Sequence, residues 1–113
     1  MKNNNVNRIL IVDDEPDVTE LLKYKLEQDG HVCQVVNNPL SFISVAREFN
    51  PNLIILDIMM PELNGMELYQ RVARYFPELT SRFVFLSGGA FTPEAQDFLA
   101  QIENPKLDKP IQP

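Results

Sequence analysis

The chain has 113 residues, 44% of them hydrophobic, and this combination predicts one globular domain rather than a disordered segment. Its 10 basic and 16 acidic residues give a formal charge of −6 without any run of lysine or arginine, so direct binding to nucleic acid or to an anionic membrane is not expected. The single cysteine, Cys33, excludes an internal disulfide and a cysteine-based metal site.

Two further features of the sequence bear on where in the cell the protein is found. No apolar run approaches the roughly 18 residues of a membrane span, and the polar start MKNNN is unlike a signal peptide. A lone cysteine is typical of a reducing compartment. We therefore expect a soluble, cytoplasmic domain.

Short apolar runs typical of buried strands alternate with segments of helical periodicity along the chain. The predicted strands cover residues 8–12, 31–36, 53–56, 82–86 and 105–108. The predicted helices cover residues 16–29, 39–49, 66–76 and 93–102, three of them with a proline at the first helical position. Strands separated by helices of about 10 to 14 residues imply right-handed crossovers, so the pattern predicts an α/β fold with a parallel sheet.

The central predicted strand ends on a carboxylate. Four consecutive apolar residues, Leu53 to Leu56, indicate a strand that is covered on both faces, and Asp57 follows them at the carboxyl edge of the sheet. Pro61 then prevents the strand from continuing, and Asn64-Gly65 offers residues that tolerate a positive φ before the next helix. Ligands of open α/β sheets bind at this edge, so Asp57 is the first candidate for chemistry.

Polar side chains follow four of the predicted strands at the same edge. They are Asp13, Asp14, Asp57, Ser87 and Lys109. Three carboxylates within about 4–6 Å of one another repel by a few kcal/mol per pair, which a divalent cation would relieve. Mg²⁺ is the expected ion because it takes oxygen ligands, typically one or two carboxylates together with a phosphate oxygen.

Four motifs in these positions closely resemble the receiver domain of two-component response regulators. They are LIVDDEP, LDIMMPELNGMEL, FVFLSGGA and LDKPI. The resemblance spans nearly the whole chain, so we expect residues 1–113 to form one receiver domain. It implies a flavodoxin-like, doubly wound sheet of five parallel strands in the order 2-1-3-4-5. It also implies that the domain is a phospho-acceptor rather than a conventional enzyme. Such a domain would catalyse its own phosphorylation and, slowly, its own dephosphorylation.

The resemblance assigns roles to the phosphoryl-binding residues. Asp57 would accept a phosphoryl group from the phosphohistidine of a sensor kinase or a phosphotransfer domain. Ser87 would donate a hydrogen bond to one phosphoryl oxygen and Lys109 would pair with another. The Lys109–Pro110 peptide would be cis.

The resemblance also assigns the metal ligands. Asp14 and Asp57, with the backbone carbonyl of Met59, would bind Mg²⁺, and Asp13 would hold a metal-bound water. Phosphoryl transfer depends on positioning and charge neutralisation, which such a set supplies.

The sequence departs from the family pattern in three places. Three residues before Lys109, many receivers carry an aromatic residue that turns inward on activation, whereas this chain has Lys106. Met59 and Gly89 occupy positions that influence water attack on the acyl phosphate, and neither can orient a water, which favours slow hydrolysis. The sequence ends at Pro113, where a fifth helix is expected to begin. The SGGAFTP and LDKP wording resembles receivers fused to hybrid sensor kinases.

Alternative interpretations remain open at this stage. One is an interaction-only receiver that is never phosphorylated. A haloacid-dehalogenase-like phosphatase also places an aspartate after a strand, but it needs a second acid where Met59 stands. Without a fifth helix, one face of the sheet would be short of cover, and we expect a homodimer through that face with Leu107, Ile111 and the first helix near the contact. The motifs specify neither the cognate kinase, the signal nor the output.

Overall fold

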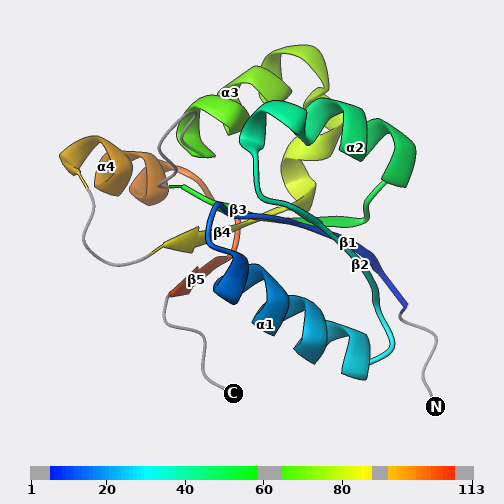
Figure 1. The fold of residues 1–113 in the computed structure, drawn as a ribbon. Helices are drawn as coiled ribbons and strands as arrows, with labels where there is room; N and C mark the ends of the chain where they lie inside the picture. Colours follow the sequence, from blue (N-terminus) through cyan, green and yellow to red (C-terminus); the bar gives the residue numbers. More distant parts are fainter. Residues whose placement is uncertain (1–5, 59–64, 88–91, 109–113) are drawn as a thin grey trace.

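The structure, a computed structural model, describes residues 6–58, 65–87 and 92–108. The strands are β1 (Arg8–Val12), β2 (Val32–Val36), β3 (Leu53–Asp57), β4 (Phe83–Ser87) and β5 (Lys106–Asp108). The α-helices are α1 (Pro16–Gln28), α2 (Phe42–Phe49), α3 (Gly65–Tyr75) and α4 (Pro93–Gln101), and two 3₁₀ helices are η1 (Pro39–Ser41) and η2 (Pro77–Arg82). All strands are parallel in the order β2-β1-β3-β4-β5, which confirms the predicted flavodoxin-like topology (Figure 1).

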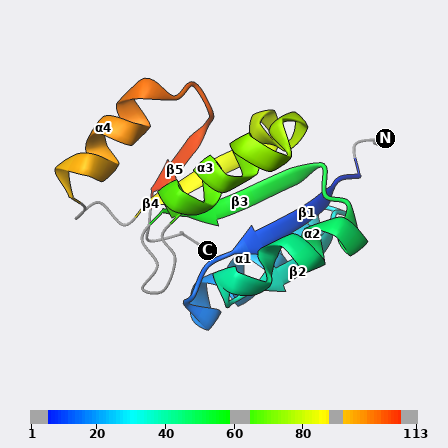
Figure 2. The same ribbon diagram turned by 90° about the horizontal axis from the view of Figure 1, so that it is seen from above.

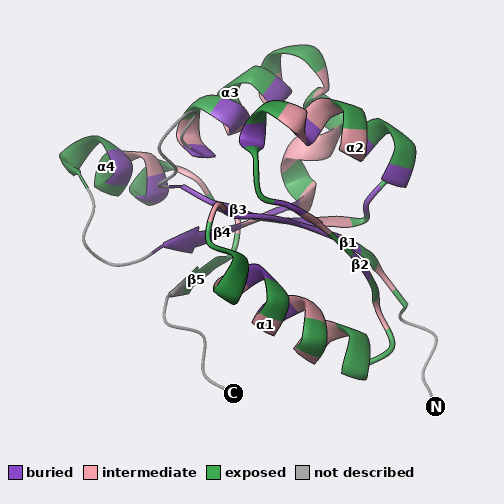
Figure 3. Ribbon diagram, viewed as in Figure 1, coloured by how far each residue is buried: buried purple, intermediate pink, exposed green. Residues whose placement is uncertain are grey.

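The helices cover the sheet unequally. Helix α1 lies on one face, whereas α2 and α3 lie on the other and α4 packs toward the β4 and β5 side (Figures 1 and 2). The side chains of β1 alternate accordingly: Leu10 and Val12 belong to the core beneath α2 and α3, and Ile9 and Ile11 to the core beneath α1. Both faces of the central strands are therefore buried, as Figure 3 shows, and this explains why they consist of unbroken apolar runs.

Local signals set the ends of several helices as predicted. At the end of α1, the Gly30 N–H donates to the Glu27 carbonyl at 3.0 Å and Gly30 has a φ of +92°, which is the left-handed conformation that favours glycine. At the start of α4, the Thr92 side chain accepts a hydrogen bond from the Ala95 N–H at 3.2 Å.

Two proline-containing segments differ from the prediction. Pro39 was expected to open the second α-helix, but it begins the 3₁₀ helix η1, and α2 starts only at Phe42. The Asn38 side chain accepts from the Leu40 N–H at 3.0 Å, and this tight turn takes the place of the first α-helical turn. Pro77 ends α3 as expected, but it also begins η2, so β4 starts at Phe83.

An aromatic cluster attaches α3 and α4 to β4. The Tyr69 ring meets the rings of Phe83 and Phe98 edge-on, with centroids 5.3 and 5.6 Å apart. Phe98 of α4 also meets Phe85 at 5.4 Å, again nearly perpendicular. Such edge-to-face pairs add roughly 0.5–1.5 kcal/mol each beyond their buried area. These contacts fix α4 against the sheet although it lies at the side of the molecule.

The described residues hold four α-helices, the last of which, α4, precedes β5. At the α1 side of the sheet Leu86 is fully buried, while Leu107 on β5 is 41% exposed. Ile111, the other residue expected at a dimer contact, lies outside the described residues. Self-association through this face therefore stays a prediction. Among the described residues, no helix has the length and apolar character needed to cross a bilayer.

Candidate functional site

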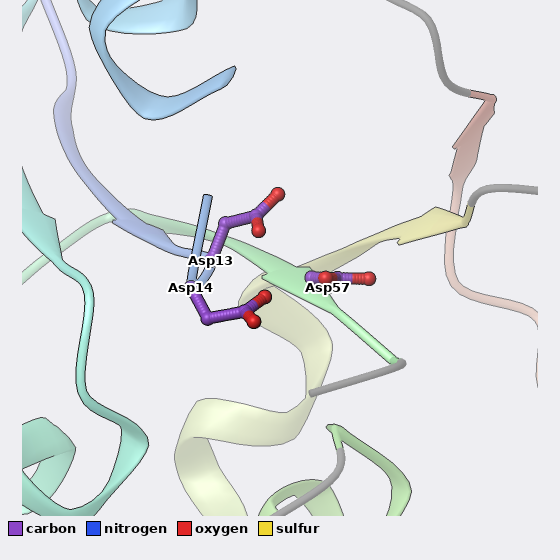
Figure 4. A group of neighbouring side chains, drawn as sticks. All are labelled: Asp13, Asp14 and Asp57. Atoms are coloured by element: carbon purple, nitrogen blue, oxygen red, sulfur yellow. The ribbon is translucent and has the colours of Figure 1, made fainter. Parts of the chain in front are cut away.

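The register of the central strands places two aspartates beside each other. Val12 of β1 lies opposite Leu56 of β3, so the next residues along the two strands, Asp13 and Asp57, are neighbours at the carboxyl edge. Both residues are buried although they carry carboxylates: Asp13 is 0% exposed and Asp57 is 2% exposed. Figure 4 shows their side chains with that of Asp14, which comes from the turn after β1.

The three aspartates form one cluster. Asp13, Asp14 and Asp57 can each offer a carboxylate oxygen such that these oxygens lie within 4.8 Å of one another, and Asp14 is half-buried. At this separation two negative charges repel by about 3–4 kcal/mol if the effective dielectric constant is near 20. An all-oxygen, anionic donor set suits a hard divalent cation, so the residues present fit Mg²⁺.

Backbone hydrogen bonds hold Asp13 in place. Its N–H donates to the Val36 carbonyl at 3.1 Å, which extends the pairing of β1 with β2 by one residue. Its Oδ1 accepts from the Glu15 N–H at 3.0 Å, and this bond shapes the turn into α1. The carboxylate is therefore oriented by the chain before any ligand binds.

Sequence reasoning did not single out two polar residues that support this turn. The Asn37 side chain donates through Nδ2 to the Asp13 carbonyl at 2.8 Å and to Thr19 Oγ1 at 3.3 Å. Thr19 in turn donates to the Pro16 carbonyl at 3.0 Å. The available signal was a threonine between the apolar residues of the first helix, and Thr19 is indeed 1% exposed.

Asp57 is fixed by its neighbours on both sides of the sheet edge. The Ile58 N–H donates to the Leu86 carbonyl at 3.1 Å, and the Gly65 N–H donates to the Ile58 carbonyl at 3.0 Å. A Cβ on Gly65 would press on the Asp57 carbonyl oxygen and lie 2.6 Å from Ile58 Cα. Gly65 was expected to serve a positive φ, but it is the first residue of α3, and its role is to let the helix approach the strand end.

Ser87 lies on the strand next to Asp57. It is the last residue of β4 and is 5% exposed, and the residue before it, Leu86, is the register partner of Asp57. The structure thus places Asp13, Asp14, Asp57 and Ser87 at one edge of the sheet. The other two predicted contributors, the Met59 carbonyl and Lys109, lie outside the described residues.

This arrangement matches a known family. The profile of the response regulator receiver domain covers residues 9–113. The chain belongs to the response regulator receiver domain family. It is thus a receiver domain of two-component signalling, and the acidic cluster Asp13, Asp14 and Asp57 is the acidic pocket typical of such receivers.

The chain is similar to proteins of different lengths. An uncharacterized 14.6 kDa protein of Leptolyngbya boryana is 34% identical over 105 residues, which are 93% of this receiver and 80% of that protein. The transcriptional regulatory protein TrcR of Mycobacterium tuberculosis is 37% identical over 65 residues, or 58% of this receiver, but the match spans only 25% of TrcR. Identity with such regulators is therefore confined to a part of their length.

Solved structures agree on the fold of the receiver. The signal receiver domain of a signal transduction histidine kinase from Syntrophus aciditrophicus superposes with a TM-score of 0.79 at 28% identity, over 95% of this chain and 81% of that one. The Vibrio cholerae chemotaxis protein CheY4 gives a TM-score of 0.80 at 19% identity, over 95% of this chain and 89% of that one. The second comparison shows the fold alone.

Proposed function

We propose that residues 1–113 form one receiver domain that accepts a phosphoryl group on Asp57 from the phosphohistidine of a sensor kinase or a phosphotransfer domain. The observation that carries the proposal is the cluster of Asp13, Asp14 and Asp57, with carboxylate oxygens within 4.8 Å at the carboxyl edge of a receiver-family sheet. Asp57 is the acceptor in this proposal because it alone of the three ends the central strand, β3.

In the proposed reaction, an oxygen of the Asp57 carboxylate attacks the phosphorus of the phosphohistidine. The phosphorus–nitrogen bond to the imidazole breaks as the new phosphorus–oxygen bond forms, and the histidine leaves with its electron pair and takes up a proton. The product is an acyl phosphate. Because such a transfer depends on in-line positioning, the hydrogen bonds that hold Asp57 between β4 and α3 supply the rigidity it needs.

Asp14 and Asp57, together with the Met59 carbonyl, would hold Mg²⁺ directly, and Asp13 would hold it through a water. When bound, Mg²⁺ would neutralise negative charge on the phosphoryl oxygens and on the carboxylates. Ser87, at the end of the adjacent strand, would donate a hydrogen bond to one phosphoryl oxygen, and Lys109 would pair with another. These assignments rest on the position of each residue at the strand ends and on family membership.

The direct test is phosphorylation with a small donor. Acetyl phosphate and Mg²⁺ are expected to add one phosphoryl mass that mild alkali removes, and peptide mapping is expected to place it on Asp57. Chelating Mg²⁺ with EDTA serves as the control and should suppress the adduct. A stable adduct on a hydroxyl residue would refute the proposal, and a folded domain that takes no phosphoryl group from any donor would support the docking-only alternative.

Magnesium is also expected to stabilise the fold. Since the ion relieves repulsion within the acidic cluster, Mg²⁺ at about 100 times its dissociation constant should add about 2.7 kcal/mol and raise Tm by about 10 °C. Asp14→Asn removes one of the charges and should raise Tm without metal while reducing the Mg²⁺ effect. Thermal melts with and without Mg²⁺ measure both. A Tm that responds to neither change would mean that the carboxylates do not share a cation.

A further inference from the structure

A groove between α3 and α4 is separate from the acidic cluster. It has a volume of about 470 Å³ and is lined by side chains from both helices. The two helices run in the same general direction along the β4 side of the sheet (Figure 2), and the contact between the Tyr69 and Phe98 rings joins them. The groove is therefore a feature of two fixed helices.

The lining of this groove combines apolar and acidic groups. Met66 of α3 and Phe98 of α4 are half-buried and supply its apolar surface. Glu67, Glu94 and Asp97 add three carboxylates, and none of the described residues that line the groove is a lysine or an arginine. The arginines of α3, Arg71 and Arg74, line an adjoining hollow that shares Glu67 and Gln70 with the groove, so the acidic character of the groove comes from its α4 wall.

Both properties select the same kind of ligand. The apolar surface of Met66 and Phe98 can accommodate an aliphatic side chain, because methionine adapts its shape to what it packs against. The carboxylates of Glu94 and Asp97 on the α4 wall attract cationic side chains and disfavour acidic ones. Helix α4 has 9 residues and so is about 13 Å long, which matches two to three turns of a partner helix.

We propose that the α3–α4 groove is a docking site for a basic amphipathic helix of a partner protein, with an aliphatic residue of that helix against Met66 and Phe98 and its lysines or arginines facing Glu94 and Asp97. The walls of the groove begin just after the segments that follow Asp57 and Ser87. In sequence, the groove helices therefore follow closely on residues of the acidic edge. Binding of the partner helix to the groove does not require phosphorylation of Asp57.

The test uses a synthetic helical peptide with leucines on one face and lysines on the other. Its binding to the unphosphorylated domain is followed by fluorescence anisotropy, and the contact is mapped by NMR amide shifts. The double variant Glu94→Gln/Asp97→Asn is expected to bind about fivefold more weakly, since exposed ion pairs contribute modestly. The matched control Glu20→Gln/Glu27→Gln removes the same charge from exposed positions on α1 and should bind like the parent.

A second variant tests the apolar part of the site. Met66→Gln keeps the charge of the domain and should also weaken binding, with amide shifts confined to α3 and α4. Equal weakening in the α1 control would show attraction to the overall negative charge and would overturn the proposal. So would shifts centred on α1, or a dimer in sedimentation that only the groove variants dissociate, because a second copy would then be the occupant.

Discussion

Asp57→Asn is expected to abolish phosphorylation completely while the domain stays folded. The substitution keeps the shape of a side chain that is 2% exposed, but an amide oxygen is too weak a nucleophile to take the phosphoryl group. It also removes one charge from a cluster whose carboxylate oxygens lie within 4.8 Å, so Tm without metal should rise. Mass spectrometry after treatment with acetyl phosphate and Mg²⁺, together with a thermal melt, measures both effects.

Asp14→Asn is the matched control for this result. It removes the same charge from the same cluster but leaves the proposed nucleophile in place, so phosphorylation should continue at a rate lower by about 100-fold, as is common when a metal site is impaired. The alkali-labile adduct should still map to Asp57. If Asp57→Asn carried the adduct on the same peptide and Asp14→Asn did not, Asp57 would not be the acceptor.

Gly65→Ala is expected to have the largest effect on stability. A Cβ at this position would meet three backbone atoms at the end of β3, among them Ile58 Cα at 2.6 Å and the Asp57 carbonyl carbon at 3.0 Å. Backbone cannot give way as a flexible side chain can, so the cost should reach about 3 kcal/mol, the upper part of the range for overpacking. Any relaxation displaces either α3 or the strand end that holds Asp57, and the phosphorylation rate should fall as well.

Gly30→Ala separates this steric effect from the general cost of replacing glycine. Gly30 has a φ of +92° and no neighbouring atom within 4 Å of its Cβ position, so alanine there should cost about 1–2 kcal/mol through backbone conformation alone. Its phosphorylation rate should equal that of the parent. Urea denaturation of both variants compares the losses, and a Gly65→Ala variant as stable as the parent would mean that α3 stands farther from β3.

Much of the fold follows from the alternation of short apolar runs with segments of helical periodicity. Unbroken apolar runs such as Leu53 to Leu56 are buried on both faces in the structure, and the polar residues that end those runs meet at one edge because parallel strands all point that way. This is why Asp13, Asp57 and Ser87 could be assigned to one site before their positions were known.

The parts that the sequence did not reveal depend on contacts between distant segments. Asn37 and Thr19 support the Asp13 turn through bonds that join residues 24 and 18 positions apart in the chain. Local propensity contains no information about such pairs. Likewise, Pro39 and Pro77 satisfy the rules for a helix start, yet both begin 3₁₀ turns, because tight turns and α-helices accept proline equally well at that position.

Lys106 holds the segment that follows α4 through two hydrogen bonds. Its Nζ donates to the Ile102 carbonyl at 3.1 Å and to the Asn104 carbonyl at 3.0 Å, so one cation holds the segment that joins α4 to β5. An aromatic ring at this place could turn inward by itself, but an ammonium that did so would give up both bonds and enter a core without a counter-charge. A movement of the Lys106 side chain would therefore break both bonds and release the connection between α4 and β5.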